Sequence, residues 1–324
     1  MKAVARSATL AISVLLVFVA PGILAAQLSG SLSGPVVGYV FDGNAGNLRP
    51  LKGILGSATV GGPLDTGFPV SQVLTLDASH VIVSTGADLS SVSLDAGQIS
   101  PLAIDGLPAN PTYAAASVKA SAAAFYYADS NEVRIVTGLP QEPRYTGLLQ
   151  LDRPLTHMAV SNDGTLVVYA TNEPDGNALY AWTALTGSAR FVTSATSVSD
   201  IAITRNGDAI VADRDANEVF AIWDAAGGAI RGLLADVNSG VSGPIGVAVS
   251  SENRILVANT GSAITVLDSN GRFLKTLQCD CDNSGVYPLR NGVFRLTERV
   301  DQTIYLLDAS STEERILFVP PPQE

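Results

Sequence analysis

Histidine is nearly absent from this chain: His80 and His157 are its two members, and they lie in different parts of the sequence. A zinc site built from three histidines is therefore excluded. A Ser-His-Asp triad would have to recruit one of these two residues, and no Gly-x-Ser-x-Gly motif is present. Both histidines lie beside apolar segments, so we expect structural roles for them in a turn or strand.

Positive charge is also scarce, since 19 Lys and Arg residues stand against 30 Asp and Glu residues, for a formal charge of −11. No segment concentrates Lys or Arg. Nucleic acid and anionic membrane surfaces are not expected as partners, because binding to phosphates requires clustered cations. Hydrophobic residues make up 47% of the chain and charged residues 15%, which favours a large buried core over disorder.

Long apolar runs are missing beyond the first 26 residues. There, Lys2 and Arg6 precede an apolar run at 8–20, and small residues follow up to Ala26. This pattern predicts a signal peptide over 1–26 and a flexible segment over 27–35. An uncleaved anchor is the alternative, because Leu24 fits the cleavage site less well than alanine would. The apolar run is shorter than the ~20 residues of a spanning helix, which favours cleavage. We predict an exported protein, periplasmic, secreted or associated with the cell envelope, with no membrane insertion after cleavage.

Cysteine is limited to Cys279 and Cys281. Export permits a disulfide, and an even number of cysteines suggests pairing. A bridge across one intervening residue is strained, so a local disulfide and two free thiols in a loop both stay open. Two thiolates alone do not complete a tetrahedral zinc site.

The chain does contain an internal repeat of about 43 residues, in which a short apolar strand, a polar turn and a second apolar strand recur. The clearest copies of this pair are 73–86, 116–129, 158–171, 201–213 and 247–260. Third and fourth strands follow in later copies, at 177–184 and 189–194, 217–225 and 229–235, and 262–269 and 272–277. Four short strands per repeat, joined by turns rich in Asn, Asp and Gly, predict the blade of an all-β propeller. A parallel α/β fold would require longer linking helices.

Single strands are expected at both ends of the repeat array, at 36–42, 48–54, 292–297, 303–308 and 315–320. Five complete blades span about 71–285, and the terminal strands together fill one more. We therefore predict one propeller domain over 36–320 with a tail at 321–324. Six blades are expected, closed by pairing of the N- and C-terminal strands in a shared blade, because this protects the sheet edges. Seven blades are the alternative if strands exist near 57–70 or 279–291.

The segment 244–274 resembles the NHL repeat family of β-propellers. The resemblance rests on the opening Gly246-Val247-Ala248-Val249, the second strand Ile255–Asn259 and the turn Asp268-x-x-Gly271. The segment 198–234 is similar to a second such repeat, and the likeness is good over about 156–278. It implies a six-bladed propeller. The histidine-rich zinc sites of some NHL enzymes do not carry over to a chain with two histidines.

Acidic and amide side chains follow the second strands of four repeats, at Asp129, Asn172, Asp213 and Asn259. Such equivalent positions can face the central channel, where carboxylate and amide oxygens could hold Ca²⁺. Lactonase-type propellers, which the predicted architecture resembles, have an oxygen-rich metal site of this kind. The alternative is that these residues bond to their own backbone in turns.

No catalytic residue or cofactor site is predicted, and Ca²⁺ is possible at the four positions named above. The sequence favours an exported, non-catalytic propeller, expected to be a monomer, that acts as a binding or scaffolding module for a protein or small ligand. A calcium-dependent hydrolase or lactonase with its site in the channel is the alternative. Fold alone does not choose between them.

Overall fold

The computed structural model describes residues 34–94, 99–290 and 292–322. The predicted signal segment 1–26 and residues 27–33 lie outside the described residues. Apart from one short 3-10 helix at Val237–Ser239, the regular elements of the described chain are β-strands. None of its helices is long and apolar enough to cross a membrane.

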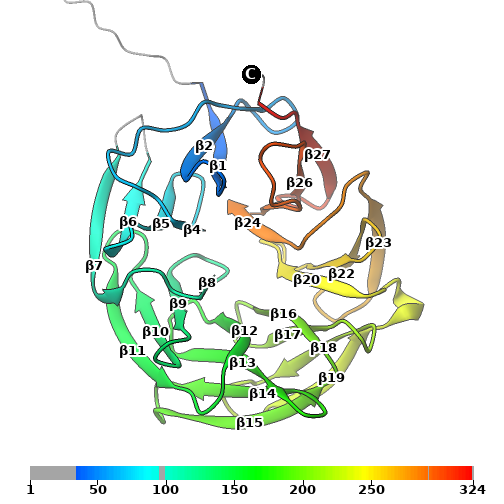
Figure 1. Ribbon diagram of the computed structural model, residues 1–324. Helices are drawn as coiled ribbons and strands as arrows, with labels where there is room; N and C mark the ends of the chain where they lie inside the picture. Colours follow the sequence, from blue (N-terminus) through cyan, green and yellow to red (C-terminus); the bar gives the residue numbers. More distant parts are fainter. Residues whose placement is uncertain (1–33, 95–98, 291, 323–324) are drawn as a thin grey trace, which may run out of the picture. The chain divides into compact units, whose positions relative to one another are not determined.

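The described strands form seven antiparallel sheets, which we number as blades 1 to 7 in chain order (Figure 1). Blade 1 has three strands: β1 (Val36–Asp42), β2 (Asn47–Lys52) and β3 (Thr59–Val60). Blades 2 to 4 have four strands each: β4 (Gln72–Thr75), β5 (His80–Ser84), β6 (Asp88–Ser93) and β7 (Ser100–Pro108); β8 (Tyr113–Ala116), β9 (Ala122–Tyr127), β10 (Glu132–Thr137) and β11 (Arg144–Gln150); β12 (Leu155–Val160), β13 (Leu166–Glu173), β14 (Gly176–Thr183) and β15 (Ser188–Ala195). Blades 5 to 7 also have four: β16 (Val198–Ile203), β17 (Ala209–Asp213), β18 (Glu218–Trp223) and β19 (Ile230–Ala235); β20 (Pro244–Val249), β21 (Ile255–Asn259), β22 (Ala263–Leu267) and β23 (Phe273–Gln278); β24 (Tyr287–Arg290), β25 (Val293–Arg295), β26 (Ile304–Asp308) and β27 (Arg315–Val319).

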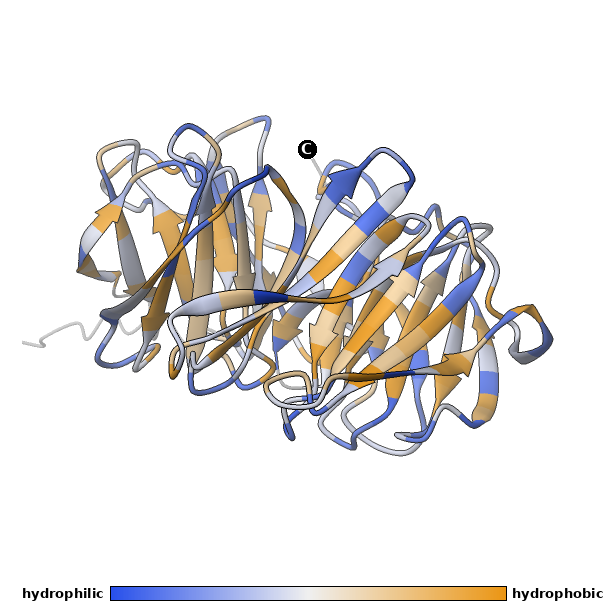
Figure 2. Ribbon diagram, turned by 90° about the horizontal axis from the view of Figure 1, so that it is seen from below, coloured by the Kyte–Doolittle hydropathy of each residue, from blue (hydrophilic) through white to orange (hydrophobic). Residues whose placement is uncertain are grey.

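The turns within the blades use residues that tolerate a left-handed backbone. Gly164 has φ +71° between β12 and β13, and Gly271 has φ +83° between β22 and β23. A Cβ on Gly271 would lie 2.6 Å from the carbonyl oxygen of Leu234, so this turn requires glycine for space as well as for conformation. Figure 2 shows the result: apolar residues run along the strands, while hydrophilic residues gather in the turns.

The core consists of seven hydrophobic clusters, each formed by the facing sides of two neighbouring blades. In the cluster between blades 4 and 5, Val168 and Leu179 pack with Phe220 and Ile222, and these four side chains have no exposed surface. Burial between adjacent sheets is what holds a propeller together, because no blade covers both of its own faces. The all-β propeller predicted from the repeat is confirmed. It has seven blades, which was the alternative to the expected six.

The predicted closure of the ring by a shared blade is wrong. Blade 1 comes entirely from the N-terminal part of the chain and blade 7 entirely from the C-terminal part. They meet through side chains: Val37 and Leu51 of blade 1 pack against Leu289 and Ile304 of blade 7. A Cβ on Gly38 would lie 2.8 Å from Cγ of Leu289, so the two inner strands approach closely. The extra strands β3 and β24 explain the difference, because they allow each end of the chain to complete its own sheet.

An ion-pair cluster joins blades 6 and 7. The carboxylate of Glu314, which precedes β27, contacts Arg254 before β21 and lies 2.6 Å from Nζ of Lys275 on β23. The Glu314 side chain has no exposed surface. Burial alone would raise the pKa of Glu314, but the hydrogen bonds from Lys275 and Arg254 hold it below its usual value. The carboxylate is therefore ionised and links the two blades.

Candidate functional site: the central channel

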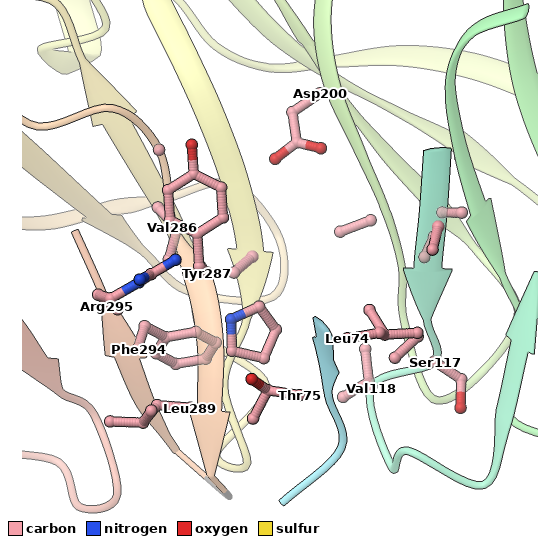
Figure 3. Close-up of a pocket in the computed structure, with 18 of the residues that line it drawn as sticks. Leu74, Thr75, Ser117, Val118, Asp200, Val286, Tyr287, Leu289, Phe294 and Arg295 are labelled. Atoms are coloured by element: carbon pink, nitrogen blue, oxygen red, sulfur yellow. The ribbon is translucent and has the colours of Figure 1, made fainter. Parts of the chain in front are cut away.

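A channel of about 980 Å³ runs along the ring axis. Its walls are the inner strands of all seven blades: β1, β4, β8, β12, β16, β20 and β24. Most of the lining side chains are apolar. This is expected because successive side chains of an inner strand point to opposite faces of the sheet, and both faces pack against a neighbouring blade. Polar side chains line both ends of the channel: Asp200 lies where the inner strands begin, and Ser117 lies near the opposite end (Figure 3), as do Lys119 and Arg205, which follow β8 and β16. We call the former the Asp200 end of the channel.

Asp200 owes its orientation to a β-bulge. Four inner strands shift register at the same repeat position, directly before Gly38, His157, Asp200 and Gly246. A bulge re-aims the side chain next to it. Glycine is favoured on two of these strands, since a Cβ on Gly246 would lie 3.0 Å from the backbone of residues 285 and 286, and one on Gly38 would lie 2.8 Å from the Leu289 side chain. His157 and Asp200 are the two positions of this set that carry a side chain.

The Asp200 carboxylate points into the channel (Figure 3). One oxygen accepts a hydrogen bond from the backbone N–H of Ile201 at 2.8 Å, and the other accepts from Val247 N–H on β20 at 2.9 Å. Burial raises the pKa of Asp200 to about 7, against the opposing effect of these two bonds. Among the described residues, no Lys, Arg or His nitrogen lies within 4.0 Å of the carboxylate. Asp200 is therefore a partly buried acid for which the described residues provide no cationic partner.

Tyr113 and His157 continue the polar cluster on the neighbouring strands β8 and β12. Their rings meet edge to face, with centroids 6.5 Å apart. Burial raises the pKa of Tyr113, and the negative charge of Asp200 acts in the same direction, so the two residues lie close enough to interact. Burial also lowers the pKa of His157, and its buried Nδ1 has no hydrogen-bond partner among the described residues. At neutral pH both side chains are uncharged.

Tyr287 and Arg295 complete the cluster from blade 7. The Tyr287 hydroxyl donates to the carbonyl oxygen of Ser284 at 3.0 Å, and burial raises its pKa to about 12. The Arg295 guanidinium lies over the Tyr287 ring, 5.4 Å from its centroid, and donates to the carbonyl oxygen of Glu298. Burial lowers the pKa of Arg295, while the charge of Glu298 raises it. Glu298, and not Asp200, is therefore the acid that balances this cation.

A smaller pocket of about 330 Å³ opens beside the channel between blades 1, 2 and 3. It shares Phe41, Val73, Leu74, Tyr113 and Ala114 with the channel wall. The remaining lining combines the apolar residues Ile82, Leu89, Pro111 and Phe125 with the polar residues Ser71, Gln72, Ser84 and Thr112, and the pocket as a whole is largely apolar. Tyr113 is thus common to the polar cluster and to this side pocket.

The four residues predicted as calcium ligands lie at the ends of second strands, and none of them is in the channel lining. Asp129 is exposed, and Oδ1 of the exposed Asn172 accepts a hydrogen bond from Asn177. Asp213 and Asn259 are buried. No group of three or more His, Cys, Asp or Glu side chains in the described part of the chain could hold a metal ion.

Asp213 and Asn259 instead bind backbone groups of the loop that leads into their own blade. The Asp213 carboxylate accepts from the N–H groups of Thr196 at 2.7 Å and Ser197 at 2.8 Å. Oδ1 of Asn259 accepts from Ser242 N–H at 2.9 Å. These bonds occupy oxygen atoms that a calcium ion would need, so the calcium site stays a prediction without support from the geometry.

His80 and the two cysteines, which the sequence also singled out, contact residues close to them in the chain or in the neighbouring blades. His80 begins β5 and its Nδ1 lies 3.0 Å from the carboxylate of Asp77 in the preceding turn. Cys279 and Cys281 form a disulfide with their Cα atoms 5.1 Å apart. Both cysteines are buried against blades 6 and 7, and Cys279 N–H donates to the carbonyl oxygen of Ser262. The pair fixes the loop between β23 and β24.

The raised pKa of Asp200 predicts a pH-dependent contribution to stability. A carboxyl group whose pKa is higher in the folded protein than in the unfolded chain stabilises the fold at low pH, and this contribution is lost as pH rises through about 7. We therefore expect the free energy of unfolding of the wild type to fall between pH 5 and pH 8, relative to that of Asp200→Asn, by an amount on the order of 1–3 kcal/mol.

Urea unfolding of both proteins at several pH values measures this difference. Asp215→Asn, at an exposed position of the loop after β17, is the matched control and should show no such pH-dependent difference. A constant difference between wild type and Asp200→Asn across this range would contradict the prediction.

No family model matches the sequence, and no curated protein shows significant sequence similarity to it. Solved structures are similar in fold. A streptogramin B lyase has a TM-score of 0.56 at 12% identity, with 78% of this chain and 83% of the lyase covered. Virginiamycin B lyase from Staphylococcus aureus has a TM-score of 0.54 at 14% identity, covering 80% and 86%. Hydrazine synthase from Kuenenia stuttgartiensis has a TM-score of 0.51 at 14% identity, covering 91% and 98%.

These similarities agree with the β-propeller fold of this chain. Identities of 12–14% show a shared fold and carry no activity to this chain. The narrower NHL resemblance, good over about 156–278, stays a prediction from the sequence.

Proposed function

We propose that this protein is an exported binding module that holds a small molecule in its central channel, with the polar group of the ligand at the Asp200 end. One observation carries the proposal: a partly buried carboxylate without a cationic partner among the described residues points into a cavity of about 980 Å³. Export through the segment 1–26 is part of the proposal and rests on the sequence alone.

The channel has the properties of a ligand site. Pockets for small molecules usually measure about 300–1,000 Å³ and combine apolar walls with a few convergent polar groups. Here Tyr113, His157, Asp200 and Tyr287 come from four different blades and meet at one end of a mostly apolar channel. Perturbed pKa values gather in the same place, as they do at many functional sites. A small ligand fits these features better than a scaffolding role, which would require none of them.

Obstructing the channel is expected to abolish ligand binding. Thr75 on β4 lies in the lining, and Thr75→Trp would place an indole in the cavity. Ligand-observed NMR with a mixed panel of small aromatic amines, alcohols and carboxylates should show compounds that bind the wild type and are lost from this variant.

Thr146→Trp is the matched control, because Thr146 is exposed on the outermost strand of blade 3. It should bind as the wild type does. Melting temperatures of both variants confirm that they fold. Ligands that bind Thr75→Trp undiminished, or a panel with no binder at all, would contradict the proposal.

A further inference from the structure

The ligand class can be inferred from the charges at the Asp200 end, on the basis of the function proposed above. Apart from Arg295, the side chains that line the channel at the Asp200 end carry no positive charge. Tyr113 on β8 and His157 on β12 are uncharged at neutral pH, β20 offers the backbone N–H of Val247, and the side of blade 7 offers Tyr287. Arg295 stacks on Tyr287, and Glu298 balances its charge. The cluster therefore has one acid for which the described residues provide no cation.

A buried carboxylate gains most from a cation that brings its own hydrogen-bond donors. An ammonium group has three donors, and the two backbone N–H groups leave part of the acceptor capacity of Asp200 free. The rings of Tyr113 and Tyr287 lie close by, and aromatic faces attract cations. A carboxylate with neighbouring aromatic rings in a desolvated site is thus suited to an organic ammonium ion.

The side pocket indicates what the ammonium group is attached to. This pocket of about 330 Å³ lies beside the channel, shares Tyr113 and four other lining residues with it, and is largely apolar, so it suits a hydrocarbon ring rather than a second charged group. We propose that the channel binds a primary amine linked to an apolar ring, with the ammonium group at Asp200 and the ring in the side pocket beyond Tyr113. The observations that carry this proposal are the missing counter-cation and the lining that the two cavities share, to which Tyr113 belongs.

Binding should depend on pH. The ammonium ion pairs with ionised Asp200, and burial raises the pKa of this group to about 7. Tyr113 and Tyr287 keep their protons between pH 6 and pH 8 because burial raises their pKa values, and burial lowers the pKa of His157, which favours its neutral form. We expect the affinity to fall as pH drops below about 7, approaching tenfold per pH unit once Asp200 is mostly protonated in the free protein.

The test uses 2-phenylethylamine, with three comparison compounds that change one property each: 2-phenylethanol lacks the charge, 3-phenylpropionate reverses it, and ethylamine lacks the ring. Dissociation constants measured by titration calorimetry at pH 8 should be lowest for 2-phenylethylamine. Ethylamine should bind at least tenfold more weakly. Asp200→Asn should weaken 2-phenylethylamine by about 10- to 100-fold, while the exposed control Asp215→Asn leaves it unchanged.

The outcomes separate this inference from the proposed function. If the alcohol or the carboxylate binds as well as the amine, or if Asp200→Asn keeps full affinity for the amine, the amine assignment is wrong, although a ligand lost on Thr75→Trp would still support a binding channel. If neither these four compounds nor any member of the mixed panel binds the wild type, both proposals fail. The pH series on the wild type needs no variant, and an affinity that stays constant between pH 6 and pH 8 would also overturn the assignment.

Discussion

Replacing Phe220 by alanine is expected to lower the free energy of unfolding by about 3–5 kcal/mol. This residue of β18 has no exposed surface and fills the cluster between blades 4 and 5. The Arg231 guanidinium also lies over its ring, 4.1 Å from the centroid. The variant loses the free energy of transferring the ring from water to the core. It also leaves a cavity between two sheets, which the surrounding structure fills only in part. Chemical unfolding followed by circular dichroism measures the effect.

Phe318→Ala provides the matched control for Phe220→Ala. Phe318 lies on the outermost strand of blade 7 and is 64% exposed, so the same substitution should change the free energy of unfolding by no more than about 0.5 kcal/mol. Similar losses in the two variants would show that burial between the blades is not the main source of stability.

Glu314→Gln is expected to cost about 2–3 kcal/mol, because it leaves the positive charges of Arg254 and Lys275 without their shared partner. The estimate is below the usual cost for breaking a fully buried pair, since these two cations are 20% and 35% exposed. The low pKa of Glu314 implies that its contribution is present above the usual carboxyl range and is lost as pH falls through that range. The difference between wild type and variant should therefore shrink on acidification.

The neighbouring Glu313→Gln removes the same charge at an exposed position and should have little effect at any pH. Melting temperatures at pH 7 and pH 4 compare the three proteins. A Glu314→Gln variant as stable as Glu313→Gln at pH 7 would mean that the ion-pair cluster does not stabilise the contact between blades 6 and 7.

The strands in the regular repeats could be predicted from the sequence, because apolar runs alternate there with turns that require Asn, Asp or Gly. The predicted strand 177–184 is β14 (Gly176–Thr183), and the predicted strand 272–277 is β23 (Phe273–Gln278). The two strands that the sequence did not reveal are short. β3 has two residues, and β24 has four, of which one is Pro288. Proline is tolerated there because the innermost strand has a free edge toward the channel.

The candidate site could not be predicted in the same way. Polar residues after second strands suggested oxygen ligands, yet Asp213 and Asn259 are occupied by backbone N–H groups of the adjoining loops. The residues that face the channel lie within the inner strands. A usable signal was present, since His157 and Asp200 interrupt apolar strands at the repeat position where Gly246 is found. That the bulge turns these side chains toward the axis depends on three-dimensional register, which a single sequence does not specify.

The closure of the ring by packing alone has a consequence for the order of the blades along the chain. Each sheet is a continuous piece of sequence, and blades 1 and 7 meet through side chains such as those of Val37 and Leu289. A circularly permuted chain that starts at any other boundary between blades would therefore rebuild the same seven sheets. No ladder crosses any boundary between blades, but blades 1 and 7 are the neighbours in the described ring that no loop connects, which makes their contact the natural place for the ring to begin unfolding.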